Sequence, residues 1–114
     1  MSGFVPSDVP IGVVISGTSY TLGGRDFSQC LVFTSGSAIA VTLPAPGNAG
    51  DLYGNWNVSI FAQGAGTVTI TPSAPVTGGS TPTINGSSSA TVTTGNSRHL
   101  FLGNDGNWYA PPGA

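Results

Sequence analysis

The sequence contains no lysine and no glutamate, and charged residues make up 5% of its 114 residues, against about a quarter in an ordinary soluble protein. The adjacent Arg25 and Asp26 fall in a glycine turn, where an ion pair would be exposed and worth about 0–1 kcal/mol. With 2 cations and a formal net charge of -2, the chain offers no basic patch to neutralise phosphates. We therefore expect neither nucleic acid nor an anionic membrane as a partner.

Titratable side chains are too scarce for ordinary catalysis, which requires an acid, a base or a nucleophile to converge. The single histidine, His99, could act as a base beside Asp105, but its strand context favours a hydrogen-bonded structural role. One histidine, one cysteine and no glutamate make a transition-metal site improbable, and no two aspartates have the spacing of a calcium loop. We expect no enzyme, no metal and no cofactor.

The single cysteine, Cys30, excludes a disulfide within the chain. It opens an apolar run, so we expect it in the core. No apolar run approaches the ~20 residues that a membrane-spanning helix needs, and the N-terminus lacks the basic region of a signal peptide.

The sequence contains many short stretches in which apolar and polar residues alternate. Residues 38–43 place every second side chain on one face, as in a half-buried β-strand. Residues 30–34 form a second β-prone run, and the loop between them contains Gly36, which can take positive φ. This pattern predicts an antiparallel hairpin that ends at Pro44.

The same pattern recurs along the chain. Further hairpins are predicted around residues 63–66 and around Gly95-Asn96, and Thr83-Ile84-Asn85-Gly86 is expected to form a short strand and turn. The fold class is therefore all-β, as a small antiparallel β-sandwich or jelly-roll-like barrel. The expected core comprises Leu31, Phe33, Ile39, Val41, Leu43, Val58, Ile60, Val68, Ile70, Leu100 and Leu102.

A weak internal similarity links Val41-Thr42-Leu43, Val68-Thr69-Ile70 and Val92-Thr93-Thr94. Stacked repeats would require a fixed period. Because the spacing is uneven, we attribute the similarity to shared strand chemistry.

Residues 1–17 differ from the single β domain expected over residues 18–114. Pro6 and Pro10 hold this segment extended and prevent a helix, while its apolar side chains are too many for a free tail. It is either an edge strand of its own domain or an arm that adds to the sheet of a neighbouring copy or of another protein. The expected contact residues of this N-terminal arm are Phe4, Val5, Val9, Ile11, Val13, Val14 and Ile15.

The tryptophans and one tyrosine are the remaining functional candidates, because exposed aromatic faces stack on sugars. Trp56 shares one strand face with Val58, which favours core packing. Trp108 and Tyr109 are adjacent and therefore face opposite ways, so one of the two should be exposed to a glycan or at an interface.

The order of motifs resembles small all-β modules of tailed-bacteriophage virion proteins. The resemblance covers residues 18–110 and is carried by Val41-Thr42-Leu43-Pro44, Gly54, Val58-Ser59-Ile60, Gly66-Thr67-Val68-Thr69-Ile70-Thr71-Pro72, Thr83-Ile84-Asn85-Gly86, and Leu100 through Gly106-Asn107-Trp108-Tyr109. Such modules occur in capsid decoration (cement) proteins and in tail-fibre domains, commonly as trimers.

This resemblance implies a structural protein with no catalytic residues. We expect a trimeric decoration protein that binds the major capsid protein on the outer surface of the virion, after synthesis in the host cytoplasm. The alternative is a tail-fibre or receptor-binding module that contacts a host glycan.

Val41→Asp should abolish folding, because it would place an unpaired charge in the core. Far-UV circular dichroism of the purified variant checks this. A spectrum and melting curve equal to those of the unmodified protein would contradict the assignment of Val41 to the core.

Overall fold

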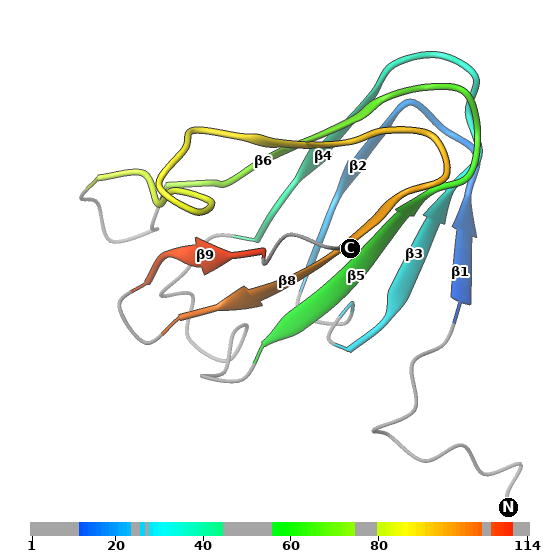
Figure 1. Cartoon of the computed structure of the whole chain (residues 1–114). Helices are drawn as coiled ribbons and strands as arrows, with labels where there is room; N and C mark the ends of the chain where they lie inside the picture. Colours follow the sequence, from blue (N-terminus) through cyan, green and yellow to red (C-terminus); the bar gives the residue numbers. More distant parts are fainter. Residues whose placement is uncertain are drawn as a thin grey trace, which may run out of the picture.

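The computed structural model describes residues 12–23, 26, 28–44, 56–74, 80–103 and 106–110. These residues form strands and connections and contain no α-helix (Figure 1). The strands are β1 (Gly12–Ile15), β2 (Ser19–Thr21), β3 (Cys30–Phe33), β4 (Ile39–Thr42), β5 (Asn57–Ala62), β6 (Val68–Thr71), β7 (Ala90–Val92), β8 (Ser97–Leu102) and β9 (Trp108–Tyr109).

The strands form two sheets that lie face to face, as in a β-sandwich (Figure 1). One sheet has the order β1-β3-β5-β8-β9, and the other has the order β2-β4-β6-β7. From β1 to β6 the chain changes sheet at every connection. Each connection is thus an arch that crosses from one layer to the other, and the two layers share the core between them.

Both sheets are mixed, which corrects the expected antiparallel arrangement. β1 pairs with β3, β3 with β5, β2 with β4 and β4 with β6, all in parallel. Antiparallel pairing is confined to β5 with β8, β6 with β7 and β8 with β9. The four parallel pairings distinguish this fold from the antiparallel sandwich or jelly-roll-like barrel that we expected.

The three predicted hairpins are also wrong, because the two strands of each lie in different sheets. β3 and β4, β5 and β6, and β7 and β8 are each divided between the two sheets. Gly36, in the first of these connections, is not among the residues with positive φ. Two amphipathic strands joined by a short loop can pair side by side or face each other across a core, and both arrangements bury the same alternating residues. Alternation therefore could not separate a hairpin from an arch.

The parallel pairs stack the first six strands as three two-strand coils, an arrangement typical of solenoids. The coils begin at residues 12, 30 and 57, so their spacing is as uneven as the sequence indicated. The segments that look alike in sequence are nevertheless neighbours in one sheet. Val68 lies opposite Val92, and Val41 lies opposite Ile70.

Two glycines are required where the arches of neighbouring coils are in contact. Gly66 N donates to Ser35 O at 3.0 Å, and Gly64 N donates to Phe33 O at 3.1 Å. A Cβ atom at Gly66 would overlap the carbonyl of Ser37, and one at Gly64 would overlap the carbonyl of Thr34. Both overlaps involve backbone atoms, which cannot move aside as a flexible side chain would.

The predicted turn at Asn85-Gly86 is confirmed, whereas the short strand expected before it is reduced to isolated bridges of Ile84. Ile84 and Ser87 exchange backbone hydrogen bonds of 2.8 Å in both directions, with φ of 53° at Asn85 and 84° at Gly86. Positive φ at both central residues defines the type I′ turn that Asn-Gly favours.

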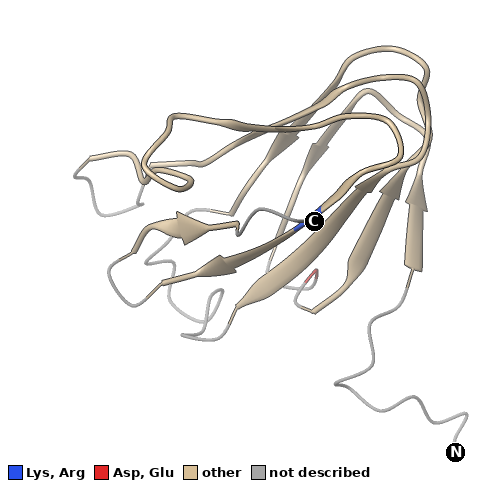
Figure 2. Cartoon of the chain, in the orientation of Figure 1, with Lys and Arg blue, Asp and Glu red and all other residues tan. Residues whose placement is uncertain are grey.

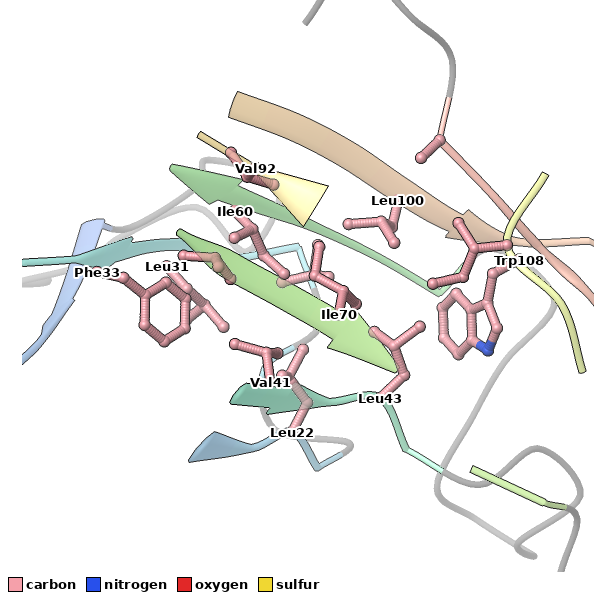
Figure 3. Packing of buried hydrophobic residues seen from close by; sticks show 14 of the residues in the cluster. Leu22, Leu31, Phe33, Val41, Leu43, Ile60, Ile70, Val92, Leu100 and Trp108 are labelled. Atoms are coloured by element: carbon pink, nitrogen blue, oxygen red, sulfur yellow. The ribbon is translucent and has the colours of Figure 1, made fainter. Parts of the chain in front are cut away.

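The core lies between the two sheets and contains the largest buried side chains (Figure 3). All the core residues predicted from alternation are buried except Leu102, which is partly buried against the cluster. Trp56 is fully buried, as expected, and its ring meets that of Trp108 edge-to-face with centroids 5.5 Å apart. Alternation did not identify the further buried residues Leu22, Ala62, Ile84, Val92, Trp108 and Ala110.

The two ends of the stack differ. At one end the antiparallel strands β7, β8 and β9 close the fold, and Arg98 on β8 donates from Nε to Thr91 O and from Nη1 to Ala110 O, both at 3.2 Å. At the other end, β1 and β2 each have a neighbouring strand on one side only among the described residues. These two edges form the open end of the stack (Figure 1).

Gly66→Ala should lower the free energy of unfolding by about 2–4 kcal/mol, because the new methyl group forces two arches apart. Gly36→Ala is the matched control, since a Cβ at Gly36 meets nothing within 4 Å. Urea unfolding of the two variants and the unmodified protein measures the difference. Equal losses in the two variants would contradict the requirement for close arch packing.

Candidate interaction surfaces

The outer face of the five-stranded sheet is one of the two sheet surfaces that face away from the core. Strand pairing aligns Val14, Val32 and Phe61 in one row across β1, β3 and β5. A second row contains Phe101 and Tyr109 on β8 and β9. Ser59 and His99 lie opposite each other between these rows. This outer sheet face therefore combines apolar and neutral polar side chains and has no carboxylate, lysine or arginine among its described residues.

Three ring side chains are in contact on this face. Phe101 and Tyr109 stack with ring centroids 6.4 Å apart, and they are 38% and 37% exposed. His99 meets Phe101 edge-to-face at 6.0 Å, and its Nε2 lies 3.0 Å from Asn57 Oδ1. Because that oxygen only accepts, His99 Nε2 donates this hydrogen bond. The expectation of a hydrogen-bonded histidine is thus confirmed, and Asp105 lies outside the described residues.

The two adjacent aromatic residues do face opposite ways. Tyr109 is exposed, while Trp108 is 0% exposed and packs on Trp56. The Nε1 of Trp108 has no hydrogen-bond partner among the described residues. Of the two residues proposed from the sequence, only Tyr109 can therefore present its ring to a partner in this conformation.

The contact residues expected in the N-terminal arm divide into two groups. Phe4, Val5, Val9 and Ile11 lie outside the described residues. Val13, Val14 and Ile15 lie in β1, an edge strand of the five-stranded sheet. Val13 and Ile15 are partly buried against the core, whereas Val14 is 69% exposed, the highest value among the exposed large hydrophobic side chains of the described chain.

Asp26 and Arg98 are the charged residues of the described part of the chain (Figure 2). Asp26 is buried, contrary to the exposed position that the sequence suggested, and its expected partner Arg25 lies outside the described residues. Its carboxylate accepts hydrogen bonds from Tyr20 Oη and Gly23 N, both at 2.9 Å. These two bonds replace water around the carboxylate, as burial of a charge requires.

Cys30 is partly buried and its thiol is free. It lies on the outer sheet face, next to Ser59, because Leu31 and Phe33 occupy the inward positions of β3. The expectation of a core cysteine is wrong, since the alternation of β3 is set by its larger neighbours. The described residues contain no group of three His, Cys, Asp or Glu side chains that could hold a metal.

Hydrogen bonds join the turn at Asn85-Gly86 to β9 and the residue after it. Asn85 Nδ2 donates to Ala110 O at 2.7 Å, and Ala110 N donates to Asn85 Oδ1 at 2.9 Å. Trp108 N donates to Thr83 O at 2.8 Å. Two of the motifs that carry the resemblance, distant in the sequence, thus meet at the closed end of the stack.

Sequence reasoning missed the outer sheet face as a unit, because its residues come from five separate strands. Phe61 and Phe101 each alternate with core residues on their own strands. This alternation was the available signal that both side chains face away from the core. The strand order that brings them onto one face is not encoded in any local pattern.

No protein-family model, curated protein or solved structure matches the chain. Within the described part of the chain, no helix is long and apolar enough to cross a bilayer.

Asn85→Gly should destabilise the protein by about 1–3 kcal/mol, because it leaves the buried backbone N–H of Ala110 without its partner. Glycine keeps the positive φ of the turn, so the change isolates the side-chain bonds. Thermal unfolding measures the loss. The control is Asn96→Ala, which removes an exposed bond to Thr93 and should change the melting temperature little; an equally small change in Asn85→Gly would contradict the role assigned to Asn85.

Proposed function

We propose that the chain is a structural protein of a tailed-bacteriophage virion, and that it is a capsid decoration protein that binds and stabilises the outer capsid surface. The resemblance in motif order supports this proposal. The observation that carries it is physical: a β-stack with few charged residues, in which two edge strands have no neighbour on one side among the described residues. Such a surface is suited to lasting contacts between proteins, because little charge must be desolvated on association.

The partners under this proposal are further copies of the chain, as a trimer, and the major capsid protein. Low charge supports self-association, since few like charges oppose it. The N-terminal arm would supply contacts that a compact domain alone lacks. The protein would be made in the host cytoplasm and act on the virion surface without a cofactor or a chemical step.

A tail-fibre or receptor-binding module is the second candidate, and the exposed ring pair favours it. Phe101 and Tyr109 stack next to the His99–Asn57 hydrogen bond, and aromatic faces beside amide and imidazole groups are ordinary components of carbohydrate sites. Glycan-array binding that is lost in Tyr109→Ser and kept in Ser97→Ala, a change on the same face, would favour this function.

Cryo-electron microscopy of virions from the encoding phage tests the main proposal. We expect density for the chain at symmetry-related positions on the outer capsid, and particles from a deletion strain should release DNA at a lower temperature. Adding the purified protein back should restore the release temperature. Density confined to the tail would overturn the decoration role in favour of the second candidate.

A further inference from the structure

The open end of the stack has properties of an acceptor site for an additional strand. β1 and β2 contain no proline, lysine or other charged residue, although natural proteins commonly use these residues to protect exposed edges. At the closed end, in contrast, Arg98 binds the Thr91 carbonyl of β7, and residues 83–85 hydrogen-bond to β9. One end of the stack is therefore protected, whereas the other lacks these protective features.

The free backbone groups of β1 can be assigned from its pairing. Thr34 N donates to Ile15 O at 3.1 Å, so the Ile15 carbonyl points toward β3. Because successive residues of a strand direct their N–H and C=O groups to opposite sides, the corresponding groups of Val14 point to the free edge. They are available to a strand that lies next to β1.

The side chains of β1 indicate what kind of strand fits there. Val13 and Ile15 face the core and are only partly buried, and Val14 faces outward and is 69% exposed. A strand beside β1 would therefore meet apolar groups on both faces. β2 differs, since its outward residues Ser19 and Thr21 are polar and exposed.

We propose that the free edge of β1 binds the N-terminal arm of a second copy of this chain, through the segment that contains Phe4 and Val5. Adjacent residues of a strand face opposite ways, so this pair supplies one apolar side chain to each face. Residues 1–11 end directly at β1, and when extended they reach roughly 36 Å, far more than the ~4.8 Å between paired strands.

The same arm is less suited to pair with β1 of its own chain. A fold-back would need residues 6–11 as the loop, whereas hairpin loops commonly have two to five residues. That loop would contain both prolines and would leave Val9 and Ile11 outside the pairing. Donor and acceptor are different surfaces, so the contact between copies is head-to-tail, and a ring such as a trimer forms where the rotation between copies closes. This inference rests on the self-association in the proposed function. Its test, however, needs only the purified protein.

Two full-length variants separate donor from acceptor. Phe4→Asp combined with Val5→Asp disables the arm and leaves β1 free. Val14→Pro removes the free-edge N–H and leaves the arm intact; proline is tolerated at such edge positions. Each variant alone should be a folded monomer, with self-association weakened by roughly 100-fold or more. Mixed together, they should form a one-to-one dimer, because one copy supplies the arm and the other the edge.

Sedimentation velocity with matched melting curves gives the result. Ser19→Pro is the control: it places a proline on the outer edge of β2, away from the proposed site, and should associate like the unmodified protein. A monomeric unmodified protein, a variant that still associates normally, or two monomeric variants that form no dimer when mixed would each overturn the proposal. A lower melting temperature in both variants without any change in mass would instead indicate pairing within one chain. None of these outcomes bears on where the protein lies in a virion.

Discussion

The stacking of arches at one edge of the molecule is the constraint on which the rest of the fold depends. Ile15 O accepts from Thr34 N at 3.1 Å, Ser35 O accepts from Gly66 N at 3.0 Å, and Ala62 O accepts from Gly95 N at 2.7 Å. These bonds satisfy backbone groups that would otherwise be lost where the chain leaves one sheet for the other. They also fix the position of each coil relative to the next one, and this position sets the register of both sheets.

Once the arches are aligned, the core follows from strand alternation. Each coil contributes inward side chains from both sheets, so that residues such as Leu31 and Val41 meet across the interior (Figure 3). The bulky pair Trp56 and Trp108 fills the region toward the closed end. Backbone pairing and apolar burial thus reinforce each other, which is a mark of a sequence with one preferred structure.

The two ends of the stack differ in how their backbone groups are satisfied. The closed end uses antiparallel strands, the Asn85 turn and Arg98 to satisfy its backbone groups. The open end has no such devices among the described residues, and its half-covered apolar side chains remain accessible. This asymmetry fits the proposed assembly, in which the closed end would limit growth and the open end would accept a partner.

The sequence by itself determined the all-β class, most of the core and the turn at Asn85-Gly86. These are local properties: alternation with period two decides which side chains are buried, and an Asn-Gly pair readily takes positive φ. It also determined that the side chains of Trp108 and Tyr109 point to opposite faces of their strand. Only the tertiary structure decided that consecutive strands belong to different sheets, that Cys30 faces outward and that Asp26 is buried. Each of these depends on which strands become neighbours, and a loop such as Ser35-Gly36-Ser37 permits either a hairpin or an arch. The outer sheet face and the open end exist for the same reason, since both are made by strand order and not by any single segment.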